Sequence, residues 1–101
     1  MIRHIVMFKF LPEADGYTAG ENAERTAKML RELQGVVPTL KASEVHLNAE
    51  YADSTNYDLV LISDFETFED LQAYIVHPNH KAVGAFMRPL RESRTCVDFE
   101  I

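Results

Sequence analysis

The chain has 101 residues, of which 47% are apolar and 26% charged, a balance typical of one folded globular domain. Its formal net charge of −6, without a basic cluster, argues against nucleic acid as a partner. No apolar run approaches the ~20 residues that span a bilayer, so we expect no membrane association. Cys96 is the single cysteine, which excludes an internal disulfide. Because Met1 leads straight into an apolar stretch without the features of a secretory signal, we expect a cytoplasmic protein.

The first predicted element is a strand from Ile2 to Phe10. Side chains of a strand point alternately to its two faces. One face therefore carries Ile2, His4, Val6, Phe8 and Phe10, and the other carries Ile5 and Met7. The stretch from Pro12 to Tyr17 contains the turn pair Asp15-Gly16 and is predicted to be a connection.

A helix and a second strand follow this connection. Thr18 and Glu21 have the spacing of a capping box, which starts a helix. Apolar residues then recur at helical intervals, at Ala23, Ala27, Leu30 and Leu33, until Gly35 offers a stop. The stretch Ala42 to Asn48 alternates again, with Val45 and Leu47 on one face, and predicts a half-exposed strand.

A third strand is predicted from Tyr57 to Phe65, after a loop from Ala49 to Asn56. Residues 59–62 are all apolar. We therefore expect this strand to be buried on both faces.

Two helical segments and a last strand complete the chain. Thr67 and Asp70 have a capping pattern that begins a helix, and Pro78 ends it. The apolar side of this helix carries Phe68, Leu71, Tyr74 and Ile75. A shorter helix from His80 to Leu90 is expected to turn Ala82, Val83 and Phe86 inward. The last strand runs from Arg94 to Ile101, where Thr95, Val97, Phe99 and Ile101 alternate with Cys96, Asp98 and Glu100.

The element order β-α-β-β-α-(α)-β predicts a single α+β domain over residues 1–101, with the ferredoxin-like fold and an antiparallel four-stranded sheet. Two helices can cover only one face of such a sheet, yet the first and third strands carry apolar residues on both faces. A second copy packed through a two-fold axis would cover the other face without any further partner. We therefore predict a homodimer joined through the sheet faces.

Titratable side chains are densest between Tyr74 and His80. An imidazole titrates near neutral pH, and a phenol can hydrogen-bond a carbonyl or an enolate. Tyr74 and His80 are therefore candidate catalytic residues for acid–base chemistry. The alternative is that His77 and His80 cap backbone carbonyls at a helix end while Tyr74 packs into the core.

His4 is the one polar residue on its face of the first strand. It is therefore either buried with a hydrogen-bond partner or turned toward a cavity, where it could meet a ligand. Val6 and Phe8 share this face, and the three residues form the predicted substrate-binding set.

We predict no cofactor and no metal. His77 and His80 are three residues apart, but Pro78 disturbs the helix that would align them, and no carboxylate has a suitable spacing. Cys96 lacks the sequence signature of a nucleophile and is predicted to be a small buried residue.

Several segments in chain order form a recognisable pattern. They are Ile2 to Phe10, Tyr57-Asp58-Leu59, Asp64-Phe65, Tyr74-x-x-His77-Pro78-x-His80-x-x-Val83 and Val97-Asp98-Phe99. The pattern resembles the stress-responsive dimeric A/B barrel (Dabb) family over nearly the whole chain. The resemblance implies a ferredoxin-like domain whose sheets pair face to face as a dimeric α/β barrel.

The resemblance leaves the activity open, because many members have no assigned reaction. A plant polyketide cyclase of this family closes an aromatic ring without an organic cofactor. By similarity, His80 would be a general base, Tyr74 would hydrogen-bond the developing enolate oxygen, and His4 would line the cavity. Some relatives hold magnesium through backbone carbonyls in a stretch that resembles Gln34 to Leu40, but carbonyl ligands leave no side-chain signature.

Three functions are therefore considered. The first is binding of a small aromatic or acyl molecule, with cofactor-independent acid–base catalysis, and it predicts an open cavity on which His4, Tyr74 and His80 converge. The second is a non-catalytic dimeric stress or scaffold protein, in which these side chains are packed and bonded to the backbone. The third is a cofactor-free monooxygenase.

Overall fold

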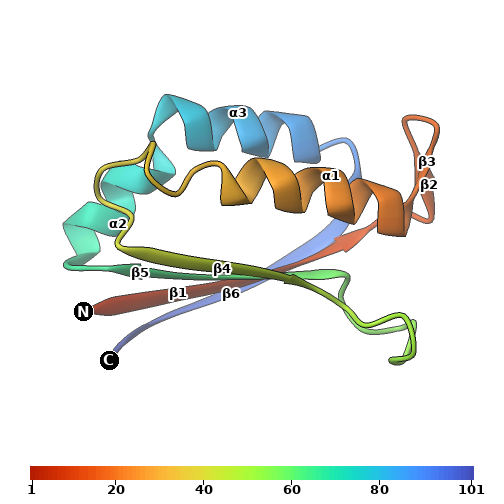
Figure 1. The fold of residues 1–101 in the computed structure, drawn as a ribbon, viewed down its shortest axis with the longest axis horizontal. Helices are drawn as coiled ribbons and strands as arrows, with labels where there is room; N and C mark the ends of the chain where they lie inside the picture. The colour runs from red at the N-terminus through yellow and green to blue at the C-terminus, as the bar shows by residue number, and fades with distance from the viewer.

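The computed structural model describes residues 1–101 and has a four-stranded antiparallel sheet with three helices on one side (Figure 1). The elements are β1 (Ile2–Phe10), β2 (Glu13–Ala14), β3 (Tyr17–Thr18), α1 (Ala19–Arg31), β4 (Ala42–Leu47), β5 (Leu59–Phe65), α2 (Phe68–Ile75), α3 (Pro78–Met87) and β6 (Arg91–Glu100). This is the α+β, ferredoxin-like architecture that the sequence predicts. None of the helices has the length and hydropathy needed to cross a bilayer.

The sheet has the strand order β4-β5-β1-β6, so β1 is central and the last strand lies beside the first. Ile2 pairs with Phe65 of β5 on one side and with Glu100 of β6 on the other. The amide of Ile101 donates a hydrogen bond to the carbonyl of Met1 at 2.9 Å, and both chain ends lie at the same end of the molecule (Figure 1). Side chains of β1 therefore occupy the middle of the sheet.

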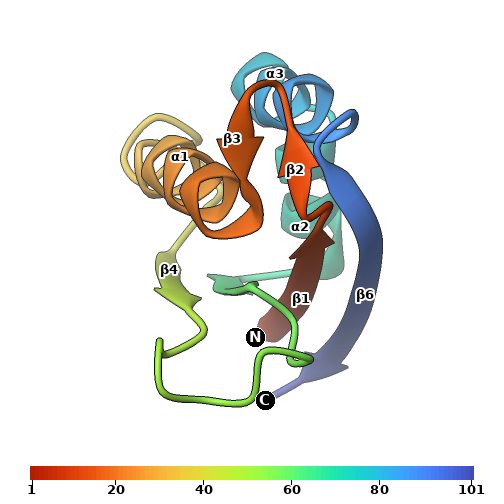
Figure 2. The same cartoon turned by 90° about the vertical axis from the view of Figure 1, so that its right-hand side faces the viewer.

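The core lies between the sheet and the helices, where α1 and α3 run above the strands (Figure 2). The alternation predicted for β1 is confirmed, since His4, Val6 and Phe8 are buried while Met7 is exposed. The core residues are Val6, Phe8, Phe10, Ala23, Ala27, Leu30, Leu33, Val37, Leu40, Val45, Leu59, Leu61, Phe65, Leu71, Tyr74, Val83, Met87 and Leu90.

The start of α1 has the predicted capping box. The Glu21 amide donates to the Thr18 hydroxyl at 3.2 Å, and the Thr18 amide donates to the Glu21 carboxylate at 2.9 Å. The helix ends at Arg31, earlier than the apolar repeat suggests. Leu33 is nevertheless buried, because the turns that follow fold it back onto the core.

The connection predicted from Pro12 to Tyr17 contains a short hairpin, β2 and β3. Asp15 and Gly16 have φ angles of 54° and 80°, as a two-residue turn with both central residues in the left-handed region requires. The Asp-Gly pair was a turn signal, but the strands on either side have two residues each and carry no alternation to predict them.

The break between α2 and α3 differs from the prediction. Pro78 does not end α2, which closes at Ile75, but is the first residue of α3. Proline suits this position because the first amides of a helix have no partner inside it. α3 therefore spans Pro78–Met87, earlier than the predicted helix, and β6 begins at Arg91, three residues before the predicted strand.

Three residues predicted to face the core, Phe68, Ile75 and Ala82, are exposed. α2 lies at one end of the sheet (Figure 1), and only Leu71 and Tyr74 on it are buried. In α3 the buried residues are Val83 and Met87, one turn apart. Each of these short helices therefore packs on the core through one narrow row of side chains, spaced three or four residues apart.

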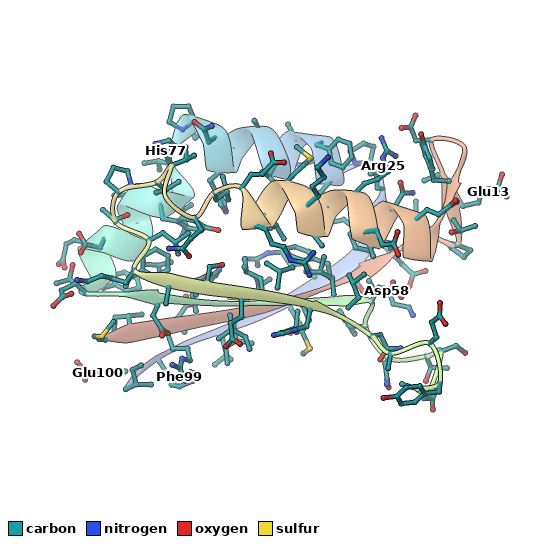
Figure 3. All side chains as sticks on the ribbon, in the orientation of Figure 1. Glu13, Arg25, Asp58, His77, Phe99 and Glu100 are labelled. Atoms are coloured by element: carbon teal, nitrogen blue, oxygen red, sulfur yellow. The ribbon has the colours of Figure 1, made fainter.

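The opposite face of the sheet carries no helix. The expectation that β5 is buried on both faces is wrong for the single chain, because Val60 and Ile62 on this side are half-buried. Met7, Val97 and Phe99 are exposed to 38%, 55% and 39%, and Figure 3 shows Phe99 on the side of the sheet away from the helices. We call this surface the open face.

Candidate active site

His80 lies in the first turn of α3 and is anchored through one ring nitrogen. Its Nδ1 donates a hydrogen bond to the carbonyl of Ile75, the last residue of α2, at 3.0 Å. A carbonyl only accepts, so Nδ1 carries the proton and Nε2 presents its lone pair. Nε2 forms no hydrogen bond in the structure. Burial lowers the pKa of His80, which keeps the ring neutral at neutral pH.

Tyr74 is buried beneath His80, with only 1% of its surface exposed. Its ring centre lies 4.4 Å from that of His80 and 6.5 Å from that of His4. Burial raises the pKa of the phenol to about 12, although the neighbouring Ser63 hydroxyl works against this shift. Ser63 is itself buried without a completed hydrogen bond. At neutral pH the phenol is therefore protonated and can donate.

His4 is both buried and partnered. Its Nδ1 lies 2.5 Å from a carboxylate oxygen of Asp98, the residue paired with it across β1 and β6. Reasoning from the sequence missed Asp98 as a site residue. The antiparallel pairing of the first and last strands could have identified it, but only with the correct register.

Cys96 is exposed, which corrects the prediction of a buried residue. It lies on the edge strand β6, where the helices cover less of the sheet than they do over β1. Its Sγ is 3.5 Å from His4 Nδ1 and 3.6 Å from Asp98. Partial burial, together with the charge of Asp98, raises the pKa of this thiol and disfavours the thiolate.

His4, Cys96 and Asp98 have potential metal-ligand atoms within 4.8 Å of one another, a group that the sequence analysis did not identify. The hydrogen bond between His4 and Asp98 explains this proximity without an ion. The positive charge of Arg94 acts on Cys96 and would oppose a cation there.

His4 and His80 line a cavity of about 160 Å³ between the sheet, α1 and α3. Its lining consists of His4, Val6, Phe8, Leu30, Leu61, His80, Val83, Gly84, Met87, Arg88, Arg91 and Arg94. All three predicted substrate-binding residues and His80 are thus brought to one cavity. Tyr74 lies behind this wall, packed against His80, and is not part of the lining itself.

His77 has a structural position. It is the N-cap of α3, at the turn seen in Figure 3, and its Nδ1 accepts a hydrogen bond from the Asn79 amide at 3.1 Å. The alternative interpretation, in which both histidines cap carbonyls at a helix end, is therefore wrong for His77, which caps an amide, and right for His80, which bonds the Ile75 carbonyl. His77 does not line the cavity.

Two larger hollows lack this combination of groups. One, of about 510 Å³, lies between the start of α1 and the loop after β4 and has no histidine in its lining. The other, of about 680 Å³, includes Met7 and His46 and extends along the open face. Neither is lined by a histidine that, like His80, has one ring nitrogen hydrogen-bonded to the backbone.

The sequence model of the stress responsive A/B barrel domain matches residues 2–101. The chain belongs to this family. No curated protein matches it.

Solved structures share the fold of this A/B barrel protein. A dimeric ferredoxin-like protein of unknown function from Thermobifida fusca is 29% identical, with a TM-score of 0.81, over 99% of this chain and 90% of that one. A dimeric protein of unknown function from Bacteroides fragilis is 28% identical, with a TM-score of 0.79, over 99% and 95%. A hydroxynitrile lyase from Passiflora edulis has a TM-score of 0.79 over 99% and 92%, but at 14% identity it shows the fold alone.

Proposed function

We propose that this A/B barrel protein binds a small aromatic or acyl molecule in the cavity beside His80 and acts on it by cofactor-independent acid–base catalysis. The observation that carries the proposal is the state of His80. Its Nδ1 is tied to the Ile75 carbonyl, its Nε2 is unengaged, and burial keeps the ring neutral. A neutral imidazole with a fixed tautomer on a cavity wall is suited to act as a general base.

In the proposed reaction, Nε2 of His80 removes a proton from a carbon next to a carbonyl. The carbon–hydrogen bond breaks, its electron pair forms the enolate, and the proton moves to the imidazole. Tyr74 is protonated at neutral pH and packs against His80 just behind the lining; in the proposed reaction it hydrogen-bonds the enolate oxygen after the wall between them opens. His4 is oriented by Asp98 and contributes to binding.

Proton exchange tests this proposal without knowledge of the natural substrate. Acetophenone in deuterated water exchanges its methyl protons when a base removes them, and proton NMR follows the loss of signal. We expect the protein to accelerate this exchange, and His80→Asn to lower the acceleration by about 10²-fold or more. Tyr74→Phe removes only the hydroxyl and is expected to lower it as well.

His77→Asn is the matched control, because it makes the same substitution three residues away and asparagine can still cap α3. It should exchange acetophenone at the wild-type rate. Equal rates for wild type and His80→Asn would contradict the role of His80. Absence of any acceleration would favour the non-catalytic dimeric protein. Cofactor-free oxygenation stays a prediction, which oxygen consumption with aromatic substrates would test.

We further propose that the protein is a homodimer joined through its open face. This face exposes Met7, Val97 and Phe99 and carries the half-buried Val60 and Ile62 beside them. Contiguous apolar surface of this kind is typical of an interface. The relatives from Thermobifida fusca and Bacteroides fragilis are described as dimeric. Sedimentation equilibrium should give twice the chain mass of 11.5 kDa, and a stable monomer would contradict the proposal.

A further inference from the structure

The cavity beside His80 is lined by three arginines and by no acidic side chain. Arg88 is the C-cap of α3, and Arg91 and Arg94 belong to β6. Arg88 and Arg94 are exposed and Arg91 is half-buried, so the guanidinium groups lie at the rim of the cavity. In a chain with a net charge of −6, this rim is a local excess of positive charge.

The other arginines of the chain are engaged by the protein itself. Arg3 and Arg25 each form an ion pair with an aspartate, and Arg31 donates a hydrogen bond to a backbone carbonyl. None of the three cavity arginines forms an ion pair with a carboxylate of the chain. A guanidinium at a cavity rim that has no carboxylate partner in the chain is suited to bind the carboxylate of a ligand, with which it forms two parallel hydrogen bonds.

Behind this rim the cavity is apolar and has the size of one ring. Its apolar wall consists of Val6, Phe8, Leu30, Leu61, Val83 and Met87. Its volume of about 160 Å³ is close to the roughly 150 Å³ of an engineered apolar cavity that holds one benzene molecule. A ligand with one ring or a short acyl chain therefore fits the interior, with its polar end toward the rim.

We propose that the cavity selects a small aromatic or acyl carboxylate, with its apolar body on the wall formed by β1 and α3 and its carboxylate bound by the rim arginines. This inference rests on the proposed function, because it requires that the cavity take up a small molecule. Arg94 and His80 line the same cavity, and the positive charge of Arg94 acts on the imidazole. A carboxylate at Arg94 therefore lies next to the proposed base. The nearby Asp98 is not part of the lining and is bound to His4.

Binding of a matched pair of probes tests the charge selection. Benzoate and benzamide have the same shape, but only benzoate is charged, and NMR titration of the labelled protein measures both affinities and the residues that shift. We expect benzoate to bind at least tenfold more tightly than benzamide, with shifts at the cavity residues. The triple variant R88Q/R91Q/R94Q should lose this preference, because it loses the charged hydrogen bonds. Arg25→Gln removes one charge elsewhere and should keep the preference.

Each other outcome contradicts the inference in a distinct way. Equal affinities for the two probes at the cavity would show that it binds small molecules without charge selection, so that the proposed function stands and this inference fails. A preference that survives in the triple variant would exclude the arginines as its cause. Inorganic phosphate that binds as tightly as benzoate would show a plain oxyanion site. Without shifts at the cavity for any probe, both proposals fail together.

Discussion

The protonation of His80 links the site to the stability of the chain. Burial lowers the pKa of His80 below its usual 6.5, against the opposing effect of the Ile75 carbonyl, while His4, Arg94 and His77 add smaller lowering effects. Between the folded-state pKa and 6.5, the unfolded chain binds more protons than the folded chain. The free energy of unfolding should therefore be fully retained above pH 6.5 and fall as the pH drops through this window.

Urea unfolding at a series of pH values checks this expectation, with His80→Asn as the comparison. The wild type should lose more stability than the variant as the pH falls below 6.5. Identical profiles would show that His80 titrates alike in the folded and unfolded chains. NMR titration of the imidazole gives the folded-state pKa directly.

Individual site residues differ in how far the sequence could predict them. His4 was recognisable because it interrupts an apolar strand face, and His80 because it stands in a dense motif. Asp98 was not, because its pairing with His4 depends on the register of two strands at opposite ends of the chain. Arg88 and Arg94 were missed because they stand on a helix end and on a strand, whose side-chain periodicities do not relate them.

At the scale of the elements, two glycines have opposite roles. Gly84 lies inside α3, and a Cβ added there would meet no atom within 4 Å. Gly84→Ala should raise the free energy of unfolding by roughly 0.5–1 kcal/mol, because alanine loses less backbone entropy on entering a helix. Gly35 follows α1 with a φ of +87°, a left-handed conformation that an alanine side chain disfavours. Gly35→Ala should therefore lower the free energy of unfolding by roughly 1–2 kcal/mol. Thermal or urea unfolding measures the change in stability of each variant. If both variants were stabilised or both destabilised, the opposite roles of the two glycines would be contradicted.

The strongly periodic elements were predictable and their ends were less so. β1 and α1 carry long apolar repeats with clear starts, and both were located within a few residues. The α2–α3 junction differs from the prediction, because a proline is compatible both with the end of one helix and with the first turn of the next. The inward rows of α2 and α3 depend on where each short helix docks, which periodicity over eight to ten residues does not determine.

At the scale of the whole molecule, the open face sets the expected assembly. Val97 is 55% exposed at the centre of the pairing between β1 and β6, where it pairs with Ile5. Val97→Glu would place a charge from each subunit in a two-fold interface, since both subunits carry the change. We expect the dimer dissociation constant to rise at least tenfold, which corresponds to about 1.4 kcal/mol.

Val36→Glu is the matched control, because Val36 is 47% exposed in the turn after α1, away from the open face. Sedimentation at several concentrations should detect dissociation of Val97→Glu alone. If the two variants remain equally dimeric, another surface joins the subunits.

The central position of β1 also constrains how the chain folds during synthesis. This strand is synthesised before both of its partners, because β5 and β6 follow it by about 50 residues or more along the chain. Contacts between distant parts of a sequence form slowly, because the entropy cost of closing a long loop comes before the stabilising energy of the contacts. Until β6 has left the ribosome, β1 remains an unprotected edge with apolar residues on both faces, the kind of segment that aggregates. The same topology that centres His4 in the site therefore leaves β1 of the nascent chain unprotected against aggregation until β6 pairs with it.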